Sequence, residues 1–248
     1  MQYKNNQLDF ITTPLSHILR EATVALCGIG NTMNTYPLND YILQSIFLRM
    51  TGAQEQKFKS IIWELASDNY EYRYLKFWKN SPMECSILRQ KNQVCEDIVS
   101  QIKKFSPNLG KEIHCWKNIL VDNAKKAMKE SIEDSFLISA NPRQYETFNE
   151  ILFKISGKCL DLDKAFFSGN DTSVLNAIYN SLYDQRNTCA HNTRAQRQNI
   201  PSLSMISNPI YIYNNYFLYF FVLLLIDEII IKIFAMYKEA ITYNLNAD

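Results

Sequence analysis

Glycine, proline and histidine are all scarce in this chain: its 248 residues include six glycines, seven prolines and three histidines. A β-sandwich or an alternating β/α protein needs many turns, and turns depend on glycine and proline. The scarcity therefore argues against turn-rich folds and favours long helices with few breaks. The histidines are isolated, there is no Cys-x-x-Cys, and no cysteine is paired with a histidine at ligand spacing, so we expect no zinc site.

A strong net charge is also lacking. The formal charge is +1, so no global field draws the chain towards nucleic acid, and any such contact must depend on a local basic patch. Hydrophobic residues make up 47% and charged residues 21%, which is ordinary for a globular protein and excludes a disordered one.

The six scattered cysteines indicate buried, reduced thiols. The N-terminal stretch "MQYKNNQLDFITTPL" has no apolar signal-peptide core, so we expect a cytoplasmic protein. No helix face carries an acidic cluster of the kind that holds a magnesium pair, and no motif indicates a cofactor. We therefore predict neither metal nor cofactor.

The longest hydrophobic run is "YFLYFFVLLLI", residues 216–226. A membrane-spanning helix needs about 20 apolar residues, and this run has eleven before Asp227 and Glu228 interrupt it. We interpret it as a core or interface helix that is buried on all sides, and we predict no membrane association.

Helical periodicity recurs along the chain. Between Pro82 and Phe105 apolar residues recur at spacings of three and four, and Lys91 is one of the charged residues off that stripe. The other predicted helices are one or two over 42–65 with Gly52 as the break, one capped by Asn141 and ending at Gly157, one beginning near Asp171, and one over about 212–242.

These patterns predict an all-α fold, a helical bundle formed by one domain over residues 1–248. The best candidate for a boundary is the short segment "SPNLG" at 106–110, which would separate an N-terminal helical addition at 1–105. We find no internal repeat and no low-complexity segment.

One short motif carries chemistry: "RNTCAH", with Arg186, Asn187 and His191. Histidine can take and give a proton near neutral pH, and arginine grips phosphate with a permanently charged planar fork. These two groups supply what metal-free cleavage of an RNA backbone requires. An Arg-Asn pair followed by histidine at this spacing arises by chance about once in a hundred chains of this composition.

An arginine and a polar residue followed after three residues by a histidine, between the last two helices of an all-α bundle, resembles the HEPN superfamily. Many of its members are metal-independent endoribonucleases of toxin–antitoxin, CRISPR-associated and abortive-infection systems. The resemblance implies that His191 transfers protons, that Arg186 binds phosphate and that Asn187 positions the substrate. It also implies a homodimer with a shared site. Toxins paired with nucleotidyltransferase antitoxins usually have a tyrosine two places after the histidine, and Thr193 stands there instead.

Residues 51–66, "TGAQEQKFKSIIWELA", also look like the first core helix of some HEPN domains. Arg194 and Arg197 follow the motif and are candidates for binding the RNA backbone. An antitoxin or a defence-system protein is a further candidate partner. The expected function is thus an endoribonuclease that acts as a toxin or an anti-phage effector.

Two alternatives remain open. The first is a non-catalytic HEPN-like module that binds RNA or protein, in which Arg186 pairs with an acid such as Asp184 and His191 caps the helix. The second is a helical scaffold that does not bind nucleic acid. Outside the motif, the aromatic and basic segment "NYEYRYLKFWKN" (69–80) could stack on bases, although its helical spacing favours a core stripe.

Overall fold

The computed structural model describes residues 2–27, 36–79, 83–106, 108, 112–168, 173–191 and 209–245. The α-helices are α1 (Gln2–Thr12), α2 (Ser16–Ala25), α3 (Tyr36–Asp68), α4 (Tyr70–Arg73), α5 (Leu88–Phe105), α7 (Lys117–Ile132), α8 (Phe136–Ala140), α9 (Pro142–Leu152), α10 (Val174–His191) and α12 (Tyr216–Leu245). A π-helical segment (Tyr74–Lys79) follows α4. The only β pairing in these residues is an isolated bridge between Leu160 and Phe167. The predicted all-α fold is confirmed.

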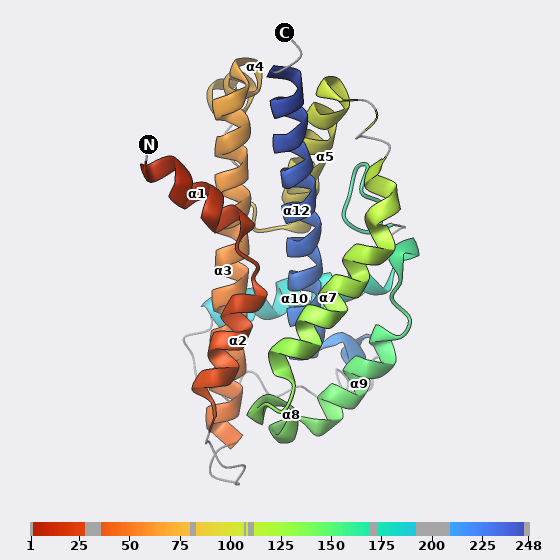
Figure 1. Ribbon diagram of the computed structural model, residues 1–248. Helices are drawn as coiled ribbons and strands as arrows, with labels where there is room; N and C mark the ends of the chain where they lie inside the picture. Colours follow the sequence, from red (N-terminus) through yellow and green to blue (C-terminus); the bar gives the residue numbers. More distant parts are fainter. Residues whose placement is uncertain are drawn as a thin grey trace.

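The C-terminal helix α12 is the centre of the fold, and helices α3, α5, α7, α9 and α10 pack around it (Figure 1). Every side chain from Tyr216 to Ile226 is at most 9% exposed. A helix that is apolar on all faces is stable in water only where neighbours cover every face. The interpretation of this run as a buried core helix is therefore confirmed. None of the described helices is long and apolar enough to cross a membrane.

This burial corrects one expectation. The sequence left open whether this apolar helix is a core helix or an interface helix, and an interface helix would have supported a dimer. The helices of a single chain already cover residues 216–226. The hydrophobicity of α12 therefore gives no support to a dimer.

The other long element is α3, a single helix of 33 residues that runs along the bundle beside α12 (Figure 1). Gly52 does not break it. One glycine within a helix costs only about 1 kcal/mol relative to alanine. The contacts of α3 with α1, α2, α10 and α12 outweigh that cost.

Helix α5 begins at Leu88 rather than near Pro82, and it corrects the placement of one lysine. Lys91 lies three and four residues before Val94 and Cys95, which are buried, and it is itself only 2% exposed. Its charge suggested a solvent-facing position, but its spacing places it on the buried face of the helix. Lys91 is therefore a core residue.

Helix α9 begins at Pro142 as predicted but ends at Leu152, not at Gly157. Asn141 stands just before it without capping it. The Asn141 side chain instead exchanges hydrogen bonds of 3.0 and 3.1 Å with Asn39 of α3. Tertiary pairing thus replaces the local cap that the sequence suggested.

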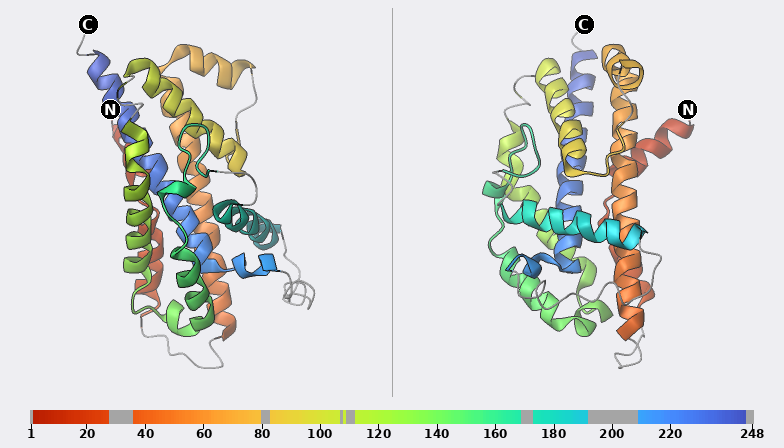
Figure 2. Two further views of the ribbon diagram at one scale, coloured as in Figure 1. Left: turned by 90° about the vertical axis from the view of Figure 1, so that its right-hand side faces the viewer. Right: turned by 180° about the vertical axis from the view of Figure 1, so that it is seen from behind.

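Helix α10 lies across the bundle behind α3 and α12, and its C-terminal end lies beside α3 (Figure 2). Buried residues before and after the segment 106–110, such as Ile102 and Leu120, belong to one hydrophobic core.

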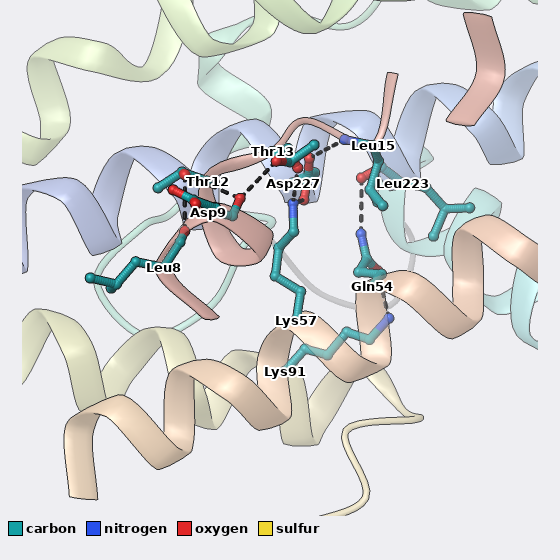
Figure 3. A network of polar contacts seen from close by, with 10 residues as sticks. All are labelled: Leu8, Asp9, Thr12, Thr13, Leu15, Gln54, Lys57, Lys91, Leu223 and Asp227. Carbon is teal, nitrogen blue, oxygen red and sulfur yellow. Dashed lines mark hydrogen bonds and ion pairs between the residues drawn. The ribbon is translucent and has the colours of Figure 1, made fainter. Parts of the chain in front are cut away.

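A buried polar network crosses this core (Figure 3). The Lys57 ammonium of α3 contacts the Asp227 carboxylate of α12 and donates a 2.8 Å hydrogen bond to the Thr13 carbonyl. The second carboxylate oxygen of Asp227 accepts a 2.7 Å bond from the Leu15 backbone N–H. The network thus ties the turn between α1 and α2 to both long helices.

Candidate functional site

Arg186 and Asn187 lie in the last two turns of α10, and His191 is the last residue of that helix. The side chain of His191, and all of Arg194 and Arg197, lie outside the described residues. The helix continues without a break from Arg186 to His191. Residues five apart on a regular helix point about 140° from each other, so one chain cannot direct both side chains squarely at one phosphate.

The Arg186 side chain is held by α3. Its Nη2 donates to both carboxylate oxygens of Glu55, at 3.0 and 3.2 Å, and its Nη1 donates to Oδ1 of Asn187 at 3.3 Å. The Arg186 side chain is 25% exposed and that of Glu55 is 17% exposed. Charge-assisted bonds to a carboxylate fix a guanidinium in orientation as well as in place.

The acid that pairs with Arg186 is therefore Glu55 and not Asp184. Asp184 precedes Arg186 by two residues, which places it about 200° away around the helix axis, and it is exposed. No local pattern identifies Glu55, because the pairing depends on how α10 crosses α3. Residues 51–66, noted in the sequence as a likeness to a first core helix, contain it.

A second cation lies in the core next to this pair. The Lys91 ammonium of α5 donates a 2.6 Å hydrogen bond to Oε1 of Gln54, the neighbour of Glu55 in α3. The amide nitrogen of Gln54 in turn donates a 2.9 Å bond to the Leu223 carbonyl of α12 (Figure 3). Because Lys91 is buried, its pKa falls to about 8, an effect that Glu55 opposes and Arg186 reinforces.

Two aromatic rings face the same ammonium. Lys91 Nζ lies 5.5 Å from the ring centre of Tyr179 and 5.8 Å from that of Phe58. Tyr179 precedes Arg186 by seven residues, about two turns, so both lie on the face of α10 that is turned towards α3 and α5. Lys91 therefore joins α5 to the helix that carries the motif.

The cysteines near the site, Cys85 and Cys189, are poor candidates for a nucleophile. Burial raises the pKa of Cys85 to about 11, and it also raises the pKa of Cys189 above its ordinary value. Thiols with raised pKa values stay protonated and react slowly. The expectation of buried thiols fails for Cys27 and Cys115, which are exposed.

The aromatic segment after α3 does not form the expected core stripe. Tyr70 and Trp78 are almost 80% exposed, and Tyr74 is about half exposed. Tyr72 is buried instead and donates a 2.9 Å hydrogen bond to Asp97. A π-helical turn over Tyr74–Lys79 changes the angular spacing that the prediction assumed.

Sequence reasoning thus named Arg186 and Asn187 as candidate site residues, and it did not name Glu55, Gln54 or Lys91, which the structure places near them. Comparison of the chain with protein-family models, with curated proteins and with solved structures found no match.

Proposed function

We propose that this protein is a metal-independent endoribonuclease of HEPN type, a cytoplasmic toxin or anti-phage effector. The observation that carries the proposal is the geometry of Arg186. It is a partly exposed cation that a carboxylate from another helix holds in orientation, and it lies five residues before a histidine at the end of α10. An oriented guanidinium next to a proton-transfer group is what phosphodiester transesterification requires.

In the proposed reaction the ribose 2′-oxygen attacks the adjacent phosphorus and the bond from phosphorus to the 5′-oxygen breaks. His191 moves the proton from the 2′-hydroxyl to the departing oxygen. Arg186 stabilises the charge that grows on the phosphoryl oxygens, and Asn187 positions the substrate. The products are a 2′,3′-cyclic phosphate and a 5′-hydroxyl. No step needs a metal ion.

Arg186 and His191 point about 140° apart in one chain, and a homodimer would remove this obstacle. Each site could then combine Arg186 of one chain with His191 of the other. The test is sedimentation together with mixing of variants. Arg186→Ala and His191→Ala chains should each be inactive, and their mixture should stay weakly active if two arginines and two histidines must converge. A chain that is monomeric at working concentration and fully active would refute the shared site.

One observation favours the non-catalytic module instead. The Arg186–Glu55 ion pair links α10 to α3. This structural role is enough to explain the ion pair without a substrate. In that case the motif is structural, and the protein binds RNA or a partner protein without cleaving it.

Expression in cells separates the two functions. The unchanged chain should slow growth and degrade RNA, whereas Arg186→Ala and His191→Ala should do neither. The control Lys126→Met, an exposed side chain of α7, should behave like the unchanged chain. If the Arg186 and His191 variants slow growth as strongly as the unchanged chain, catalysis by this motif is wrong. If no variant affects RNA, the binding module is favoured.

A further inference from the structure

Arg186 and Glu55 alone make a poor site for a phosphate. The two opposite charges cancel, and a carboxylate beside the guanidinium repels an incoming anion. A net charge of +1 on the whole chain does not compensate for this. If Arg186 binds the RNA backbone, the positive charge must come from another group nearby.

Lys91 is that group. No acidic side chain of the described residues forms an ion pair with it, and its contacts are the neutral oxygen of Gln54 and the faces of two aromatic rings. Lys91, Glu55 and Arg186 together carry two positive charges and one negative charge. The neighbouring ion pair of Lys59 and Glu84 is neutral. The cluster therefore has an excess charge of +1, which one anion would balance.

The position of the cluster shows where such an anion can bind. Lys91 is 2% exposed and cannot touch a ligand, whereas Arg186 reaches the surface. Glu55 occupies Nη2 of Arg186 and Asn187 occupies Nη1, while Nε has no partner among the described residues. An anion at the surface would thus contact Arg186, and the buried charge of Lys91 would attract it without touching it.

We propose that Lys91, Glu55 and Arg186 form an anion-binding site for one phosphodiester group of the RNA, in which Arg186 contacts the phosphate and buried Lys91 is a positioning residue. Lys91 attracts Glu55, so that the carboxylate orients Arg186 without neutralising the site. The proposal rests on the proposed function for the identity of the anion, and it adds a residue from α5 that the motif does not contain.

The proposal implies a dependence of RNA binding on pH. Lys91 is charged below its pKa of about 8 and neutral above it, so the excess charge is lost, and affinity falls, as the pH rises through about 8. The other charged and titratable groups that face Lys91 are Glu55, Arg186, Cys85, with a pKa of about 11, and Tyr179, with a raised pKa. Neither Cys85 nor Tyr179 titrates near pH 8.

The experiment measures binding without cleavage. The protein carries His191→Ala, and the probe is a fluorescent RNA decamer whose anisotropy is followed from pH 6.5 to pH 9.5. We expect the affinity to fall on the order of tenfold through about pH 8, because one nearby charge is lost. Lys91→Met should weaken RNA binding by a similar factor at pH 7. It should also remove the fall in affinity near pH 8, which is called the step below. Lys126→Met should keep both affinity and step.

Lys91→Arg provides a second variant that keeps the charge. Because arginine stays protonated, this variant should bind RNA as tightly at pH 9.5 as at pH 7. Circular dichroism checks that each variant is folded. If a folded Lys91→Met protein binds RNA like its parent and keeps the step, Lys91 plays no part in binding. If Lys91→Met does not fold, a step that persists in Lys91→Arg overturns the proposal.

Two further outcomes separate this proposal from the proposed function. RNA binding with the Lys91-dependent step, in a protein that never cleaves RNA, would keep the anion site and reject the nuclease. Inorganic phosphate is the competing probe. If millimolar phosphate binds with the same step but RNA does not compete for it, the site takes a free phosphate and its assignment to the RNA backbone is wrong.

Discussion

Among the residues that the structure describes, Lys57 and Lys91 are buried to nearly the same extent, and their surroundings differ. Lys57 is 1% exposed and Lys91 is 2% exposed. Lys57 meets the carboxylate of Asp227 and a backbone carbonyl, so its charge is balanced within the fold. Lys91 meets a neutral amide oxygen and two rings, so its charge is not.

We interpret this difference as one between a structural role for Lys57 and the proposed functional role for Lys91. A buried ion pair with all its hydrogen bonds made needs nothing from outside, and the Lys57 pair fastens the turn between α1 and α2 to the two long helices. An unbalanced buried charge costs stability, so a fold that keeps one is a candidate to use it. The unbalanced charge lies beside Glu55 and Arg186, where the motif of α10 meets α3.

The largest effect is expected on breaking the balanced pair. Lys57→Met leaves Asp227 buried without its cation and should lower the free energy of unfolding by about 3–5 kcal/mol. The double variant Lys57→Met, Asp227→Leu should recover much of that loss, because no charge then remains uncompensated. Urea unfolding at pH 7 measures both. A loss below about 1 kcal/mol for the single variant would mean that the Lys57–Asp227 pair does not contribute to the stability of the fold.

Lys91→Met should differ from Lys57→Met, because its effect on the free energy of unfolding should depend on pH. The lowered pKa of Lys91 means that the unfolded chain binds more protons than the folded one between about pH 8 and the ordinary lysine pKa, so the parent gains stability as the pH rises through that window. The variant lacks this gain. Relative to the variant, the parent should therefore gain about 2–3 kcal/mol between pH 7 and pH 10. Urea unfolding at the two pH values checks it, and a constant difference would show that Lys91 titrates normally.

Glu55→Gln tests the role of the Glu55 carboxylate, which lies between the cations Arg186 and Lys91. The substitution keeps the size of the side chain but removes the charge that orients Arg186, and it raises the charge of the cluster. RNA should bind at least as tightly to the His191→Ala background, while cleavage by the chain with intact His191 should slow by about tenfold because the guanidinium is less well oriented. Single-turnover kinetics separates the two quantities. Weaker binding together with unchanged cleavage would contradict the arrangement.

No effect is expected from removing metal ions. In the proposed mechanism Arg186 and His191 supply the charge stabilisation and the proton transfer, so cleavage should survive excess EDTA. Complete loss of activity that Mg²⁺ restores would overturn the mechanism.

The helices of the core could be predicted from sequence because their signals are long. The apolar run of α12 and the stripes of α3, α5 and α10 extend over several turns, and these helices were predicted. The sequence analysis did not predict α1, α2 or α7, and it placed the end of α9 too late. Asn141 was misjudged because Asn39, 102 residues away, competes for its side chain.

The candidate site could be predicted only where it is local in sequence. Arg186 and Asn187 belong to one motif, whereas Glu55 and Lys91 reach it from α3 and α5 through the crossing of helices. Lys91 did leave a signal that its charge obscured, since it stands at helical spacing to Val94, Cys95 and Ile98. A lysine on an apolar stripe is a reason to look for a buried functional cation.

The most direct test of the proposed nuclease is the chemistry of the cleaved ends. Purified protein is incubated with an RNA oligonucleotide and with the same oligonucleotide carrying 2′-deoxy sugars, and the products are identified by mass spectrometry. We predict 2′,3′-cyclic phosphate and 5′-hydroxyl ends from the RNA, no cleavage of the deoxy strand, and no products from Arg186→Ala or His191→Ala. Cleavage of the deoxy strand, or products of the same kind from folded Arg186→Ala, would contradict the role of this motif.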